Sequence, residues 1–122
     1  MSNTIKQTLD ELMKIEGALG ACVVDFKSGL ALGAVGGGPQ LNIEVAAAGN
    51  SEVMRAKMKV MGQLGLKDRI EDMLITLNSQ YHIIRPLTNH PNLFIYMALS
   101  RANANLALAR YKIQELETAM TV

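Results

Sequence analysis

The spacing of apolar positions changes several times along the chain, and each change predicts a new element. Over residues 3–16 apolar side chains recur every three or four positions, which is typical of an amphipathic helix. Residues 19–26 and 30–35 are apolar at most positions and flank a tight turn that ends at Gly29, so they predict a β-hairpin. Residues 41–63 return to helical spacing and predict the longest helix.

The second half of the chain predicts three strands and a final helix. Residues 70–78 alternate between apolar and polar side chains, which indicates a strand with one solvated face. Residues 80–88 contain Pro86, whereas residues 93–99 are apolar on both faces. Helical spacing over residues 102–120 follows. The predicted order is helix, two strands, helix, three strands, helix.

The burial expected for each strand predicts its place in the sheet. Strands that are apolar on both faces belong in the centre, and strands with a polar face or a proline belong near the rim. We therefore predict an α/β fold with a five-stranded, mainly antiparallel sheet in the order second, first, fifth, fourth, third strand, with helices on both faces. A length of 122 residues with 49% apolar composition fits one domain over residues 1–122.

The third predicted strand would leave a bare edge, which invites pairing with another chain. The simplest resolution is that it pairs with its own copy across a two-fold axis, which gives a homodimer with a continuous sheet. Small residues early in the long helix would allow two helices to approach closely, although they would also suit packing on the chain's own sheet. The predicted dimer interface comprises Ala46, Ala47, Gly49, Val53, Met54, Met58, Met61, Met73, Ile75 and Leu77.

Charge and composition restrict the classes of function. The net charge of +1 does not provide the basic stripe that nucleic-acid binding requires. The start of the chain is polar and no apolar run approaches about 20 residues, so we expect neither a signal peptide nor membrane insertion. The single Cys22 cannot form an intrachain disulfide, which indicates a cytoplasmic location. A mild basic cluster is either a solvated face or an anionic docking patch: Lys57, Lys59, Lys67 and Arg69.

The residues predict no catalytic, cofactor or metal site. The glycines of residues 36–38 lack the Lys-Ser or Lys-Thr pair of a phosphate-binding loop. His82, His90 and Cys22 have no metal-ligand spacing, and a Cys–His pair would still need an orienting third group. We expect Cys22 to be a small core residue.

Structural roles account for the polar residues around the final helix. Ser100 or Asn103 is expected to cap it by accepting a hydrogen bond from a free backbone N–H. Asn105 would then lie one turn into the helix and tie it to a neighbouring loop. Arg110 is expected to pair with a carboxylate.

Four stretches taken together resemble the roadblock dynein light-chain family. They are residues 16–21, 25–30, 84–87 and 104–110, and their order and spacing extend over most of the chain. The resemblance implies a profilin-like sandwich, a homodimer or heterodimer with a shared sheet, no catalytic residues and no cofactor.

Members of that family serve as light chains on motor complexes, as scaffolds for Ras-like GTPases, and in bacteria as partners or activators of small GTPases. The resemblance therefore implies a non-catalytic dimeric adaptor that binds a small Ras-like GTPase and modulates its nucleotide cycle or localisation. Arg55, Arg69 and Arg101 are candidates by type for a residue that reaches a partner's nucleotide. The alternatives are a passive light-chain or assembly scaffold, and a sensor with a small-molecule site between the sheet and a helix.

Overall fold

A computed structural model describes residues 3–39 and 41–122. The predicted element order is confirmed. The elements are α1 (Ile5–Leu12), β1 (Ala18–Asp25), β2 (Leu30–Gly36), α2 (Ile43–Gln63), β3 (Met73–Thr76), β4 (Gln80–Pro86), β5 (Leu93–Ser100) and α3 (Leu106–Thr118).

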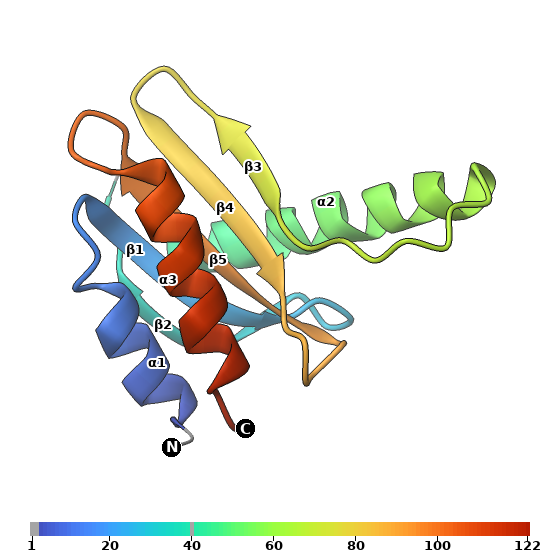
Figure 1. Cartoon of the computed structure of the whole chain (residues 1–122), viewed down its shortest axis with the longest axis horizontal. Coiled ribbons are helices and arrows are strands. Elements are labelled where there is room, and N and C mark those ends of the chain that lie inside the picture. Colours follow the sequence, from blue (N-terminus) through green and yellow to red (C-terminus); the bar gives the residue numbers. More distant parts are fainter. Residues whose placement is uncertain (1–2, 40) are drawn as a thin grey trace.

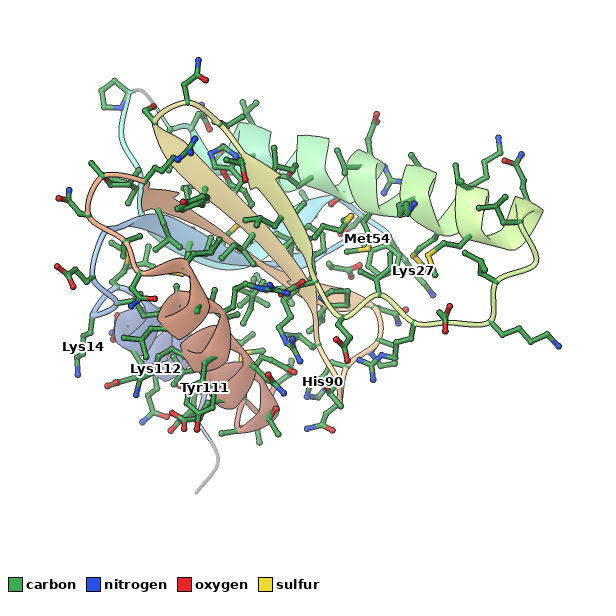
Figure 2. The ribbon with its side chains drawn as sticks, turned by 45° about the horizontal axis from the view of Figure 1, so that its top comes forward. Lys14, Lys27, Met54, His90, Tyr111 and Lys112 are labelled. Atoms are coloured by element: carbon green, nitrogen blue, oxygen red, sulfur yellow. The ribbon has the colours of Figure 1, made fainter. Side chains whose placement is uncertain are left out.

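The five strands form one sheet in the predicted order β2-β1-β5-β4-β3, and every neighbouring pair is antiparallel. Helices α1 and α3 cover one face of this sheet, and α2 crosses the other face (Figures 1 and 2). The predicted α/β fold class is thus confirmed, including the placement of helices on both faces.

Two apolar cores lie on the two faces of the sheet. Strands β1 and β5 contribute to both, because successive side chains of a strand point to opposite faces. Val23 and Ile95 pack toward α1 and α3, and Cys22 and Tyr96 pack toward α2. The double-sided burial predicted for these two strands follows from this central position.

Several boundaries differ from the sequence prediction, and the first helix ends at Leu12 rather than at residue 16. The third strand is Met73–Thr76, shorter than the predicted residues 70–78, and the last helix begins at Leu106 rather than at residue 102. Asn105 is the N-cap of α3, since its side chain accepts a hydrogen bond from the Leu108 N–H at 3.1 Å. The prediction that Ser100 or Asn103 caps the helix is therefore wrong. The Asn103 amide instead donates to Ser100 Oγ at 3.2 Å and holds the preceding turn.

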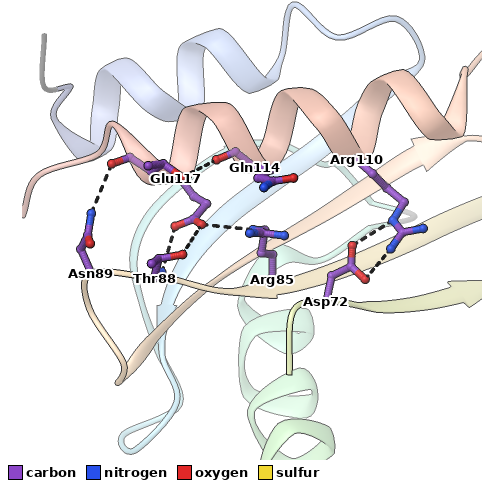
Figure 3. A network of polar contacts seen from close by, with 8 residues as sticks. Asp72, Arg85, Thr88, Asn89, Arg110, Gln114 and Glu117 are labelled. Carbon is purple, nitrogen blue, oxygen red and sulfur yellow. Dashed lines mark hydrogen bonds and ion pairs between the residues drawn. The ribbon is translucent and has the colours of Figure 1, made fainter. Parts of the chain in front are cut away.

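Polar contacts attach α3 to the loops at the β3–β4 side of the sheet (Figure 3). Buried Glu117 accepts hydrogen bonds from Arg85 Nε at 3.2 Å, from the Thr88 N–H at 3.0 Å and from Thr88 Oγ1 at 2.7 Å. Arg110 donates to both oxygens of Asp72 at 2.8 and 2.9 Å, which confirms the carboxylate partner predicted for it. These contacts fix the start of β3 and the loop after β4.

Candidate functional site: an open sheet edge beside an exposed helix

Strand β3 is an edge of the sheet, as predicted, and among the described residues it pairs with β4 alone. The Leu77 N–H donates to the Gln80 carbonyl at 2.8 Å. Hydrogen-bonding direction alternates along an antiparallel pair, so the N–H of Ile75 faces β4, and the N–H groups of Leu74 and Thr76 face outward. These outward N–H groups are free to donate hydrogen bonds to the carbonyl groups of another strand.

The side chains of β3 do nothing to discourage such pairing. Its register with β4 is regular, from Met73 opposite Ile84 to Thr76 opposite Tyr81. Leu74, Ile75 and the following Leu77 are 38, 37 and 41% exposed. The strand has no charged residue, proline or bulge, which are the usual devices that protect an edge.

Helix α2 presents an exposed stripe near this edge. Its first half packs on the sheet, and its second half extends past β3 beyond the sheet (Figures 1 and 2). One side of the helix carries small and apolar residues three, four or seven positions apart, a spacing that places them on one face. We call these residues the α2 stripe: Ala46, Gly49, Val53, Val60 and Leu64. All but the partly buried Ala46 are exposed.

The residues of the predicted interface differ in their exposure to solvent. Gly49, Val53, Met58, Ile75 and Leu77 are exposed, and Ala46, Met61 and Met73 are partly buried.

Ala47 and Met54 are each only 1% exposed and belong to the core between α2 and the sheet. Both side chains pack against the chain's own core rather than toward the open side of β3, so the candidate site leaves them out. The candidate site adds the exposed Val60 and Leu64, which the sequence prediction did not include, because the spacing of the stripe continues to them.

His82 lies beside the candidate site, directly opposite Ile75 in the β3–β4 ladder. Its Nε2 lies 2.7 Å from Gln80 Oε1, and its Nδ1 lies 3.2 Å from the Tyr96 hydroxyl. Burial lowers the pKa of His82. The neutral ring satisfies both contacts if Nε2–H donates to Gln80 and Nδ1 accepts from Tyr96.

The remaining candidate for chemistry, Cys22, lies in the apolar core. Cys22 is buried in the core, as predicted, and burial raises its pKa to about 12, so the thiol stays protonated. Burial, and to a smaller extent nearby Cys22, raise the pKa of Tyr96 to about 12. Within residues 3–39 and 41–122, no group of three or more His, Cys, Asp or Glu side chains could hold a metal ion.

Two of the three candidate arginines have partners within the chain. Arg55 donates to the Phe26 carbonyl, and Arg101 donates to the Leu77 carbonyl at 3.1 Å and lies over the Tyr81 ring. Arg69 is exposed and makes no ion pair in the described part of the chain. In that same part, no helix has the length and apolar character needed to cross a membrane.

Comparisons with solved structures identify the fold. MglB of Myxococcus xanthus superposes with a TM-score of 0.80 at 14% identity, covering 93% of this chain and 88% of that one. A Roadblock/LC7 domain from Streptomyces avermitilis gives 0.79 at 15% identity, covering 94% and 92%. An MglB structure with a tetrameric arrangement gives 0.79 at 16% identity, covering 94% and 83%.

The chain therefore has the fold of the Roadblock/LC7 domain, which confirms at the level of structure the resemblance seen in its sequence. No protein-family model matches the sequence, and no curated protein matches it.

Proposed function

We propose that two copies of this chain associate through β3 and the α2 stripe, so that one sheet continues through both copies. The observation that supports this proposal is the unprotected β3 edge, with outward backbone groups at Leu74 and Thr76. Pairing with the same strand of a second copy would satisfy these groups and bury Ile75 and Leu77. Ala46 and Gly49 would allow the two α2 helices to approach closely, with Val53 beside them.

The paired copies would act as a non-catalytic adaptor in the cytoplasm that binds a small Ras-like GTPase and modulates its nucleotide cycle or localisation. The sequence resemblance and the shared fold with MglB support this role. A surface built from two copies can hold the mobile loops of a GTPase in one conformation. It shifts the balance between conformations only as far as it binds one of them more tightly.

The adaptor role is tested with Ras-like GTPases encoded near this chain's gene. Each is loaded with GDP or with a non-hydrolysable GTP analogue, and its binding is measured by calorimetry. We expect one nucleotide state to bind at least about tenfold more tightly, which corresponds to about 1.4 kcal/mol. The rate of GTP hydrolysis or nucleotide exchange should change accordingly when the chain is added.

A variant that cannot self-associate provides the control. Gly49→Glu places a charge on the exposed α2 stripe and should weaken both self-association and GTPase binding. Equal affinity for the two nucleotide states would contradict the adaptor role. It would favour a passive scaffold if a stable partner without a nucleotide-binding motif were then found.

A further inference from the structure

A methionine-rich groove lies under the outer half of α2. Its volume is about 530 Å³, within the range of about 300–1,000 Å³ that is typical of ligand sites. Its walls come from α2, from the chain that returns to β3 and from the loop after β4. The apolar side chains that line it include Phe26, Met54, Met58, Met61, Leu66 and Leu87. We call this the methionine groove.

One wall of the groove is adaptable and the other is fixed. Met54, Met58 and Met61 follow one another at helical spacing, and unbranched methionines can adjust their shape to different apolar surfaces. The opposite wall is the loop after β4, which Glu117 holds through the N–H and hydroxyl of Thr88. Such a wall stays in place while the methionines adapt to an occupant.

Basic residues outnumber acidic ones in the segment that forms and follows the outer half of α2. Residues 53–69 carry five basic residues and one acidic residue, Asp68, in a chain whose net charge is only +1. Arg69 and Asp68 both line the groove, Lys67 follows its Leu66, and Arg55 bonds to the carbonyl of its Phe26, so the basic residues at the groove outnumber the one acidic residue. Lys27 follows Phe26 in the chain and lies beneath α2 with Met54 (Figure 2).

Lys67 and Arg69 make no ion pair anywhere in the described ranges, so their charge is available to a partner. Charge complementarity therefore favours an acidic occupant.

We propose that the methionine groove binds an acidic amphipathic peptide segment of a protein partner. The stretch from Met54 to Met61 spans about 10 Å of helix, which matches two turns of a bound helix. Apolar side chains one turn apart would enter the groove, and glutamates or aspartates beside them would face Arg69 and Lys67.

This binding site is distinct from the surface proposed for self-association. Met54, Met58 and Met61 occupy a different side of α2 from the stripe that contains Gly49 and Val53, because helical positions advance by about 100° per residue. The groove also lies against the loop after β4 rather than against the open side of β3. Peptide binding does not require the second copy.

The test uses a fluorescein-labelled peptide of about 14 residues, roughly four helical turns, with leucines at helical spacing and glutamates between them. Binding is followed by fluorescence polarisation at about 0.15 M salt, where the Debye length is about 8 Å. We expect the glutamate peptide to bind at least about tenfold more tightly than the same peptide with lysines in place of glutamates. Equal binding of the two would overturn the proposal.

Matched variants locate the site. Arg69→Glu should weaken binding of the glutamate peptide by about tenfold or more, because it reverses a charge at the groove. Lys59→Glu makes the same change of charge on an exposed residue of α2 outside the groove lining and should weaken binding by less than about threefold. Equal weakening by both variants would mean that net charge alone attracts the peptide, which contradicts a built site.

Methionine methyl NMR gives a readout that does not depend on folding of a variant. Addition of the glutamate peptide should shift the methyl signals of Met54, Met58 and Met61. The signals of Met97 and Met120, which are buried on the opposite face of the sheet, should stay in place. Unchanged signals from the three groove methionines, with peptide bound, would place the site elsewhere and overturn the proposal.

Two other occupants are separate outcomes. If Met58→Glu dissociates the self-associated protein and the glutamate peptide does not bind, the second copy occupies the groove and the proposal is wrong. If the chain sediments with phosphatidylserine vesicles through Arg69 and does not bind the peptide, the groove serves a membrane surface and the proposal is equally wrong. Peptide binding by a variant that stays monomeric would support the proposal even if self-association through β3 failed its own test.

Discussion

The two edges of the sheet are built differently. At β2 the ladder with β1 is interrupted between Val23 and Val24, and Leu32 is left without a partner in the register. A bulge of this kind twists an edge strand and interrupts its pairing. Gly36 ends β2 in the left-handed region at φ 69°, so the backbone turns away there. Strand β3 has none of these features.

Exposed apolar side chains alone do not distinguish the edges. Leu30 and Leu32 of β2 are 66 and 48% exposed, more than Leu74 and Ile75 of β3. Helix α1 also lies against β2, where a Cβ on Gly33 would come within 2.9 Å of Ile5. The difference is in the regularity of the backbone, because the β2 ladder is interrupted and the β3 ladder is not, and a regular edge pairs more readily with another strand.

The largest expected effect is a difference in self-association between variants that remove one outward N–H from each edge. Thr76→Pro deletes an N–H that faces away from β4 and should weaken self-association more than about a hundredfold. Ala34→Pro makes the same change on β2. The Gly37 N–H donates to the Leu19 carbonyl of β1 at 2.9 Å. Because N–H groups alternate in direction along the strand, the Ala34 N–H faces away from β1.

Analytical ultracentrifugation measures the association constants, and circular dichroism checks the fold. The Ala34→Pro variant should associate as the unchanged protein does. Equal loss of association in both variants would mean that β3 has no special role.

The second prediction concerns the stability of the fold and leaves self-association unchanged. Glu117→Gln leaves Arg85 without its buried carboxylate and should lower the free energy of unfolding by about 2 kcal/mol. Glu115→Gln on the same helix removes only an exposed contact with Lys112 and should cost less than about 0.5 kcal/mol. Denaturant unfolding measures both values. Neither variant should change association at β3, because Glu117 lies on the face covered by α1 and α3.

A smaller effect is expected from the α2 stripe. Val53→Glu places a charge on the stripe and should weaken self-association by about tenfold, or about 1.4 kcal/mol. Ala48→Glu, at an exposed position on another side of α2, should change it by less than about threefold. If dilution experiments show the reverse order, the helix meets its partner with another side.

The smallest expected effect comes from His82, which lies opposite Ile75 of the open edge. Burial lowers its folded-state pKa below the ordinary value of 6.5, so the unfolded chain binds the proton more readily. The stabilising contribution is therefore complete above about pH 6.5 and is lost as the pH falls through and below that value.

Thermal melts between about pH 7.5 and 5 should show a weaker pH dependence for His82→Gln than for the unchanged chain. His90→Gln controls for loss of a histidine at a loop. Parallel pH profiles for His82→Gln and the unchanged chain would exclude this role of His82.

The order of the strands could be predicted because the sequence marks each strand's place. β1 and β5 are apolar at nearly every position, whereas Pro86 belongs toward the rim and the alternation after residue 70 indicates an edge. The start of α3 could not be predicted, since Ser100, Asn103 and Asn105 are all suitable caps. Only the folded turn shows that Asn103 bonds to Ser100 and leaves the cap to Asn105.

The sides of α2 were less predictable. Alanine and glycine suit both a core and an interface, so the sequence could not show in advance that Ala47 is fully buried and Ala46 only partly buried. Met54 is buried and Met58 exposed because the helix extends past the sheet between them, and helical spacing does not show where a sheet ends. The methionine groove could not be predicted from the sequence either, because its walls come from segments far apart in the chain.

Amide hydrogen exchange followed by NMR tests the central claim most directly. At high protein concentration the outward amides of Leu74 and Thr76 should exchange slowly, and dilution should remove this protection. The outward amide of Ala34 on β2 should exchange rapidly at every concentration. If the Leu74 and Thr76 amides exchange as fast as that of Ala34 throughout, the β3 edge does not pair with a second copy and the account is contradicted.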